Sequence, residues 1–220
     1  MNESTSSIIQ SVIEKGITLV SNERFDTVIR HYDKINKLDG DIVECGVYKG
    51  GFSIFLTTSF TDKTIWVCDS FEGFQPLKDA VYQYGAERHT PETTSHMVQG
   101  IDIVKENFKS FNLLTDRVKF LQGWVRNTLK PETCQIKQIA LLRVDVDSYS
   151  ATHEVLDYLY PKVVSGGYII FDDSCLFETK NAIKNYFSSN KIPLVLKDPV
   201  SDGDVGIDST LQCGCYYIKP

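Results

Sequence analysis

Two kinds of hydrophobic spacing divide the chain. In the first forty residues, apolar side chains recur at the intervals typical of one face of an α-helix: Ile8, Ile9, Val12, Ile13 and Ile17. A second helical stretch begins near residue 22 and ends at Asp39-Gly40, since glycine commonly ends a helix. The pattern predicts an N-terminal helical cap over residues 1–40.

From residue 41 onward, short continuous apolar runs alternate with amphipathic helical stretches. The runs predict strands at 41–47, 63–70, 116–124, 137–147 and 166–174, with further apolar segments at 192–198 and 213–220. The intervening stretches predict helices at 50–60, 95–113, 150–163 and 178–190, with Ser95 as an N-cap. Strands that alternate with helices form βαβ units, and continuous apolar strands indicate a mostly parallel sheet covered on both faces. We therefore expect a single α/β domain over residues 1–220.

Residues 71–95 interrupt this alternation. They are polar, aromatic and irregular, with prolines at positions 76 and 91, and structureless segments of this length are usually functional. We interpret them as a lid insertion whose aromatic residues give it an apolar side: Phe71, Phe74, Tyr82 and Tyr84. His89 and His96 border this segment and are expected to be solvated.

Composition narrows the class of protein. The 220 residues are 42% hydrophobic and carry a net charge of −6, which suits one well-cored domain and gives no basic footprint for nucleic acid. No apolar run approaches the roughly 18 residues of a membrane span, and the first ten residues do not resemble a secretory signal. We expect a cytoplasmic protein whose six cysteines are reduced and mostly buried. A metal pair of Cys213 and Cys215 is a weaker alternative.

Carboxylates fall where the predicted strands end. Glu44, Asp69, the pair Asp145 and Asp147, and the pair Asp172 and Asp173 close four different strands. In an open α/β sheet, ligands bind beyond the carboxyl ends of the strands. The acidic residues should therefore converge on one ligand site.

The first strand leads into a glycine-containing turn. Gly46, Gly50 and Gly51 would let the backbone approach a ligand closely, although tight turns alone also explain such glycines. Asp69, on the next strand, could accept hydrogen bonds from a ribose diol. A nucleoside ligand is implied, while the G-x-x-x-G spacing opposes a dinucleotide binder and the missing GK[ST] opposes a phosphate-binding loop.

Asp145, Asp172 and Asp173 form the second candidate cluster. Three adjacent carboxylates repel one another, so either some are protonated or a cation lies among them. Oxygen ligands suit a hard ion such as Mg²⁺. Taken singly, Asp172 and Asp173 could instead cap the following turn, and Asp147 could cap the helix that follows it.

Several segments together resemble the macrocin O-methyltransferase (TylF-like) family. They are "DIVECGVYKGG", "IWVCDSFEGF", "RVKFLQGW", "LLRVDVDSYSATHEVLDYLYPKVVSGGYIIFDDS" and "CGCYYIKP", in order over residues 40–220. The resemblance implies a Rossmann-like class I methyltransferase fold, a seven-stranded, mostly parallel sheet whose last strand is antiparallel. It also implies an S-adenosylmethionine- and Mg²⁺-dependent O-methyltransferase that acts on a small molecule, on a sugar of a natural product or surface glycan.

The same resemblance assigns roles to individual residues. Cofactor binding would fall to Glu44, Gly46, Tyr48, Gly50, Asp69, Ser70, Gly123, Trp124 and Asp145. Asp145, Asp172 and Asp173 would hold the metal, and Asp145 would be the candidate general base. The chain departs from the family at Val146, where relatives commonly have glycine, and in its closing segment.

Two other functions fit parts of the sequence. An NAD-dependent oxidoreductase is opposed by the glycine spacing, and a cofactor-binding protein without catalysis is disfavoured by the intact set of aspartates. The acceptor would be a diol-bearing small molecule, with no nucleic acid or membrane as partner. The apolar faces of the N-terminal helices could cover the site or pair with a second subunit, so a homodimer is the expected assembly.

Overall fold

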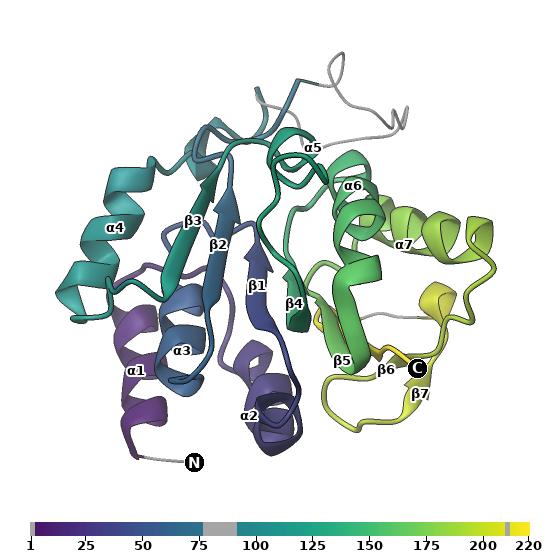
Figure 1. The fold of residues 1–220 in the computed structure, drawn as a ribbon, viewed down its shortest axis with the longest axis horizontal. Helices are drawn as coiled ribbons and strands as arrows, with labels where there is room; N and C mark the ends of the chain where they lie inside the picture. Colours follow the sequence, from purple (N-terminus) through teal and green to yellow (C-terminus); the bar gives the residue numbers. More distant parts are fainter. Residues whose placement is uncertain (1–2, 77–91, 210–211) are drawn as a thin grey trace.

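The computed structural model describes residues 3–76, 92–209 and 212–220, which surround one central sheet (Figure 1). The sheet has eight strands in the order β3-β2-β1-β4-β5-β8-β6-β7. The strands are β1 (Asp41–Cys45), β2 (Ile65–Asp69), β3 (Val118–Gln122), β4 (Ile139–Val144), β5 (Val163–Phe171), β6 (Leu196–Lys197), β7 (Asp204–Val205) and β8 (Cys215–Ile218). The first five strands are parallel, and β8 runs antiparallel to β5. This confirms the predicted fold class.

Helices cover both faces of the sheet. The α-helices are α1 (Glu3–Glu14), α2 (Glu23–Asn36), α3 (Gly51–Ser59), α4 (Ile101–Ser110), α5 (Val125–Thr128), α6 (Tyr149–Leu159) and α7 (Phe177–Ser189). Three short 3-10 helices are η2 (Ser95–Met97), η3 (Tyr160–Lys162) and η4 (Ile207–Ser209). In the described part of the chain, no helix is both long and apolar enough to span a bilayer.

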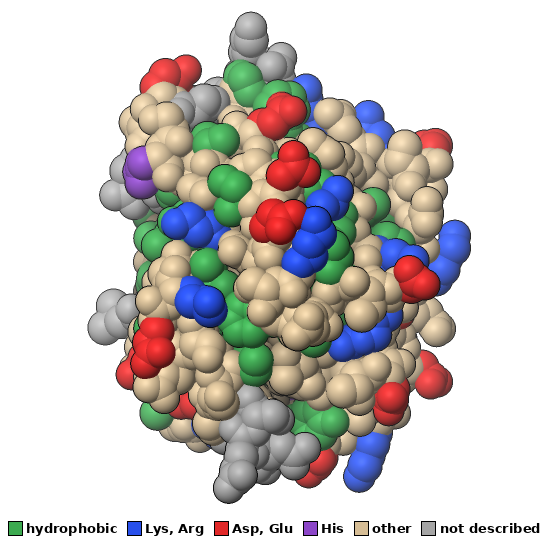
Figure 2. Space-filling model, turned by 90° about the vertical axis from the view of Figure 1, so that its left-hand side faces the viewer, with side chains coloured by type: hydrophobic (Ala, Val, Ile, Leu, Met, Phe, Trp, Pro, Cys, Tyr) green, Lys and Arg blue, Asp and Glu red, His purple; other side chains and the backbone are tan. Residues whose placement is uncertain are grey.

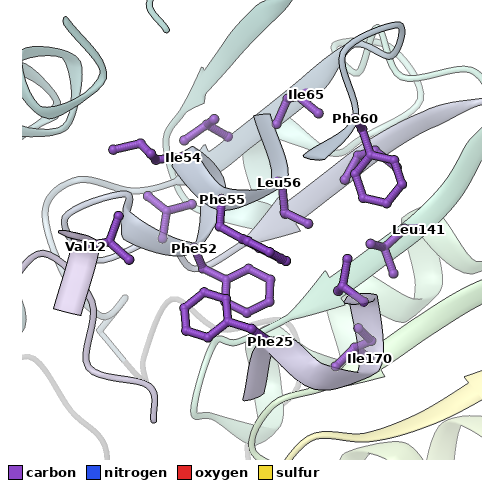
Figure 3. Packing of buried hydrophobic residues seen from close by; sticks show 14 of the residues in the cluster. Val12, Phe25, Phe52, Ile54, Phe55, Leu56, Phe60, Ile65, Leu141 and Ile170 are labelled. Atoms are coloured by element: carbon purple, nitrogen blue, oxygen red, sulfur yellow. The ribbon is translucent and has the colours of Figure 1, made fainter. Parts of the chain in front are cut away.

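Alternation along the strands produces two cores. Ile42 faces the core beneath α1 to α4, whereas Val43 faces the core beneath α5 to α7. Figure 3 shows the first core, in which the Phe25 ring of α2 stacks on Phe52 of α3 with a centroid distance of 4.7 Å. Helix α2 is therefore fixed to the helix that follows the first strand.

Acidic and basic side chains are mixed on one face of the molecule (Figure 2). Figure 2 shows the side that carries α1 and α4, where acidic and basic side chains are interspersed. On this face, the described residues form no concentrated basic surface of the kind that nucleic acids require.

The strand register brings the predicted acidic positions to one edge. Cys45 of β1 pairs with Cys68 of β2 and with Val144 of β4, and Val144 pairs with Phe171 of β5. The residues that directly follow these paired positions are Gly46 after β1, Asp69 at the end of β2, Asp145 after β4 and Asp172 after β5. A single row of strand ends thus places three carboxyl groups beside a glycine turn.

The predicted strand count of seven was one too low. The segment 192–198 contributes the two-residue strand β6, which pairs with β7 in a hairpin. Asp198 closes that hairpin, because its backbone N–H donates to Gly203 (2.8 Å) and its carboxylate accepts from the Val200 and Ser201 N–H groups. Asx-type turn bonding of this kind creates the extra strand.

The predicted N-cap at Ser95 was also wrong. Residues 95–97 form the separate 3-10 helix η2, and Val98 is extended, with a φ of −65° and a ψ of 117°. Helix α4 begins only at Ile101, after Gly100. The extended residue interrupts the helical hydrogen bonds that a single helix would need.

The cysteines are only partly as expected. Cys45, Cys68, Cys134 and Cys215 are buried thiols outside any disulfide, as predicted, but Cys175 and Cys213 form a disulfide with a Cα–Cα distance of 4.7 Å. The Gly214 N–H donates to the carbonyl groups of Phe171 and Asp172. This backbone contact holds the segment before β8 against the loop after β5. Because Cys213 is bonded to Cys175, it is not available for a metal pair with Cys215.

Gly46 is required by the approach of β1 to β4. Its φ is +84°, and a Cβ atom there would lie 1.6 Å from the carbonyl oxygen of Asp145. We expect Gly46→Ala to lower the free energy of unfolding by about 3 kcal/mol or more, measured by urea denaturation. Gly100→Ala is the matched control, because a Cβ at Gly100 meets nothing within 4 Å. Equal stability of the two variants would contradict this close approach.

Candidate functional site

A cavity of about 440 Å³ opens at the carboxyl ends of β1, β2, β4 and β5. Six carboxyl groups line it: Glu44, Asp69, Asp145, Asp147, Asp172 and Asp173. The structure therefore brings together all the acidic residues that the sequence placed at strand ends. Their surroundings divide them into three groups.

The first group is organised by Arg143, a residue of β4 that is only 1% exposed. Its Nη1 lies 2.6 Å from Glu44 Oε1 and 2.6 Å from Asp145 Oδ2, and its Nη2 lies 2.6 Å from Asp172 Oδ1. The guanidinium also lies 4.1 Å from the Phe52 ring centroid, as a cation–π contact. Burial alone would lower the pKa of Arg143, but the carboxylates of Asp145, Asp172 and Glu44 raise it well above its usual value.

Glu44 is completely buried beneath this arginine. Its other carboxylate oxygen accepts a hydrogen bond from the Ser53 hydroxyl of α3. Burial raises the pKa of Glu44, and the charge of Arg143 opposes that rise. The carboxyl group is thus tied to β4 and α3 while it forms part of the cavity wall.

Asp172 is held by a second arginine as well. Arg24 Nη1 of α2 donates to the Asp172 carbonyl oxygen (2.7 Å) and lies 3.4 Å from its Oδ2. Asp172 was expected to be a metal ligand, but the structure directs its carboxylate toward two arginines. The metal role of Asp172 stays a prediction; in the structure, the two guanidinium groups already supply a countercharge to its carboxylate.

The second group is a cluster of Asp145, Asp147 and Asp173, whose carboxylate oxygens lie within 4.8 Å of one another. Asp147 has a left-handed φ of +54°, and its N–H donates to Asp173 Oδ2 at 3.1 Å. This turn carries the Asp147 side chain into the place that the sequence gave to Asp172. Helix α6 is capped instead by Ser148, whose hydroxyl accepts from the Ala151 N–H.

The cluster is electrostatically unfavourable without a cation. Burial and the charge of Asp145 raise the pKa of Asp147 to about 6. Burial and the charge of Asp147 raise the pKa of Asp173 well above its usual range. Burial also raises the pKa of Asp145, against the charge of Arg143. A partly buried set of oxygen donors with these shifts fits a hard divalent cation.

Asp69, at the end of β2, organises the turn beside the cavity. Its Oδ2 accepts from the Val47 N–H and its Oδ1 accepts from the Phe71 N–H, each at 2.8 Å. Burial raises its pKa, and these backbone hydrogen bonds oppose the rise. Oδ1 also accepts from the Ser70 hydroxyl at 3.4 Å, so the carboxylate is fixed in place at the cavity wall.

Seven of the nine predicted cofactor-binding residues line the cavity: Glu44, Gly46, Tyr48, Asp69, Ser70, Trp124 and Asp145. Gly50 and Gly123 do not. A Cβ at Gly50 would lie 2.7 Å from Val104 of α4, so this glycine serves helix packing. Gly123 turns the chain after β3, and its N–H donates to the Asp69 carbonyl oxygen.

The remaining cavity walls come from segments in which the sequence pointed to few site residues. The linker between α1 and α2 contributes Thr18, Leu19, Val20 and Ser21. Phe74, Met97 and Gln99 also line the cavity, so the start of the predicted lid (71–95) and the segment just after it reach the cavity. Its central residues 77–91, with Tyr82, Tyr84 and His89, lie outside the described residues. His96 is exposed and does not line the cavity.

Arg24 and Arg143 were missed by sequence reasoning. Arg143 interrupts the apolar run of β4, and a charge in a strand that is buried on both faces requires partners. That signal was present in "ALLRV". Arg24 has no comparable signal, since it lies on an ordinary amphipathic helix.

The sequence is similar to known proteins over most of its length. The Macrocin-O-methyltransferase (TylF) family pattern matches residues 10–204. The chain is 36% identical over 154 residues to mycinamicin III 3''-O-methyltransferase of Micromonospora griseorubida, covering 67% of this chain and 60% of that enzyme. It is 33% identical over 177 residues to demethyldecarbamoylnovobiocin O-methyltransferase of Streptomyces niveus, covering 77% of this chain and 67% of that enzyme. The chain thus spans about two thirds of the length of these relatives.

A solved structure shares the fold. The O-methyltransferase NovP superposes with a TM-score of 0.71 at 31% identity, over 90% of this chain and 78% of that chain. Sequence and structure comparisons therefore point to the same group of proteins.

The raised pKa values predict how stability depends on pH. Carboxyl groups with a folded-state pKa above the unfolded value bind protons more tightly in the folded protein, so their contribution is lost as pH rises. We expect the Tm of the metal-free protein to fall by roughly 5 °C between pH 5 and 7.5, measured by differential scanning fluorimetry in chelating buffer. Mg²⁺ should remove most of this fall. A Tm that stays constant between pH 5 and 7.5 in chelating buffer would contradict the raised pKa values of these carboxyl groups in the folded protein.

Proposed function

Because this chain belongs to the macrocin O-methyltransferase family, we propose that it transfers a methyl group from S-adenosylmethionine to a sugar hydroxyl of a natural product. The observation that carries this proposal is the cavity itself, where a glycine turn with a strand-end Asp69 lies beside a partly buried cluster of three aspartates. The relatives are named for methyl transfer to mycinamicin III and to demethyldecarbamoylnovobiocin, which supports a glycosylated acceptor.

The cavity residues fit the nucleoside part of the cofactor. Asp69 lines the cavity at the end of β2, and we assign its carboxylate to the ribose hydroxyl groups, with Oδ2 as the main acceptor, because Oδ1 already accepts from the Phe71 N–H and from the Ser70 hydroxyl. Trp124 and Ser70 line the same side of the cavity, and we assign Trp124 to the adenine ring. Gly46 leaves room for the methionine part, because it has no side chain at the base of the turn.

The aspartate cluster fits a divalent cation. We assign Asp145 and Asp173 to Mg²⁺, which proteins commonly bind through one or two carboxylates together with water and substrate oxygens. When bound, the ion would lower the pKa of an acceptor hydroxyl and fix the direction of its oxygen. Arg143 holds one oxygen of Asp145 at 2.6 Å and so leaves the other for the ion.

Asp147 is the proposed proton acceptor. Asp145 had this role in the sequence-based hypothesis, but its ion pair with Arg143 makes it a weaker base. Burial and the charge of Asp145 raise the pKa of Asp147 to about 6, which is close to neutral pH, where general bases work best. It would take the proton from the acceptor hydroxyl as the oxygen attacks the methyl carbon.

Methyl transfer can be tested directly with acceptors of the relatives. Purified protein with S-adenosylmethionine and Mg²⁺ should add one methyl group to demethyldecarbamoylnovobiocin or mycinamicin III, detected by mass spectrometry. Chelation should reduce turnover at least 100-fold, and Mg²⁺ should restore it, because the acceptor hydroxyl loses its activating charge. Full activity after chelation would refute the metal role.

The division of labour among the aspartates is a separate prediction. Asp147→Asn should lower kcat by about 10²–10⁴-fold, the usual range for a general base, with Mn²⁺ affinity changed less than threefold in electron paramagnetic resonance titrations. Asp173→Asn should instead weaken Mn²⁺ binding at least tenfold. The exposed Asp102→Asn serves as the control. If Asp147→Asn weakens Mn²⁺ as much as Asp173→Asn, then Asp147 is a metal ligand.

A further inference from the structure

The cavity presents an electrostatic problem to the proposed cofactor. Six carboxyl groups line it, whereas two arginines, Arg24 and Arg143, are the cations among its described lining residues. The amino-acid end of S-adenosylmethionine carries an ammonium and a carboxylate. The ammonium has many acidic partners, but the carboxylate would be repelled unless a cation receives it.

Arg143 cannot be that cation. Its side chain is 2% exposed and its two terminal nitrogens already contact Glu44, Asp145 and Asp172. Its remaining nitrogen, Nε, is buried. A ligand carboxylate would have to displace one of three close ion pairs to reach it.

Arg24 differs in each of these respects. Its side chain is 22% exposed and lines the cavity. Nη1 donates to the Asp172 carbonyl oxygen, but within the described chain neither Nη2 nor Nε has a hydrogen-bond acceptor. A guanidinium anchored at one corner can present its remaining N–H groups to a planar carboxylate.

The backbone carries Arg24 to the relevant part of the cavity. The Gly51 N–H of α3 donates to the Ile17 carbonyl oxygen at 3.0 Å, which fixes the start of the α1–α2 linker beside the Gly46 turn. The linker then lines the cavity and leads into α2, where Arg24 reaches Asp172 at the end of β5. Arg24 thus stands at the end of a wall that begins beside the turn assigned to the methionine part.

We propose that Arg24 binds the carboxylate of the methionine part of S-adenosylmethionine and of its product, S-adenosylhomocysteine. The contact is a charge-assisted hydrogen bond from the guanidinium to a carboxylate oxygen, while Asp172 holds the other side of the guanidinium. This inference rests on the proposed function, because it concerns the same cofactor. It adds a residue of the N-terminal cap to the cofactor site.

Calorimetry with two nucleosides tests the proposal without an acceptor or a metal. S-adenosylhomocysteine has the amino-acid end, whereas 5'-methylthioadenosine keeps the adenosine and the thioether but lacks it. Arg24→Met should weaken S-adenosylhomocysteine about 10- to 100-fold, as expected when a hydrogen bond to a charged group is lost. Binding of 5'-methylthioadenosine should change less than twofold. Arg24→Lys, which keeps the charge, should give an intermediate loss for S-adenosylhomocysteine.

Arg30→Met is the matched control, since Arg30 lies on the same helix but pairs with Asp202 outside the cavity. It should leave both affinities unchanged. Unchanged S-adenosylhomocysteine affinity in Arg24→Met would overturn the proposal, and so would an equal loss for both nucleosides, which would mean that Arg24 only supports the fold. Wild-type protein that binds neither nucleoside would overturn the cofactor assignment of the proposed function and the role of Arg24 with it.

Discussion

A single buried cation holds the centre of this molecule together. Arg143 lies among Glu44, Asp145 and Asp172, each at 2.6 Å, and against the face of Phe52. Removing the charge of Arg143 would leave its carboxylate partners close together without their shared countercharge, at a cost of about 3–5 kcal/mol. Because these residues belong to β1, β4 and the end of β5, the ion pairs also join three neighbouring strand ends. The geometry of the cavity floor follows from them.

The same ion pairs determine which carboxyl groups remain for a ligand. Asp172 pairs with two arginines and Asp145 with one, whereas Asp147 and Asp173 are joined to each other through the Asp147 N–H. Without Arg143, the acidic residues at this edge would repel one another with no fixed arrangement. With it, oxygens of Asp145, Asp147 and Asp173 lie close together at one place. The cation site that we propose therefore depends on the contacts that Arg143 makes.

Much of this arrangement could be predicted from the sequence, and the remainder depended on tertiary contacts. Strand ends at Glu44, Asp69, Asp145 and Asp172 follow from the apolar runs, and parallel pairing makes them converge. The sequence suggested a cluster of Asp145, Asp172 and Asp173, whereas the structure brings Asp147 rather than Asp172 beside the other two. This difference depends on the left-handed turn at Asp147 and on an arginine from a distant helix, so the sequence alone could not reveal it. The Cys175–Cys213 disulfide likewise requires β5 and β8 to pair. Arg143 was visible in the sequence, as a charge within a buried strand.

The N-terminal helices take part in the site as well as covering the sheet. Phe25 of α2 stacks on Phe52, the ring that also supports Arg143, so the position of α2 is coupled to the buried cation through one side chain. Arg24 is the residue next to Phe25, and Asp172 lies between the two guanidinium groups. The amino-acid end of the S-adenosylmethionine that we propose for this site is a zwitterion, and an acidic site that accepts it needs one accessible positive group at a defined place. Helix α2 supplies such a group in Arg24, because both terminal nitrogens of Arg143 already contact carboxylates at the strand ends.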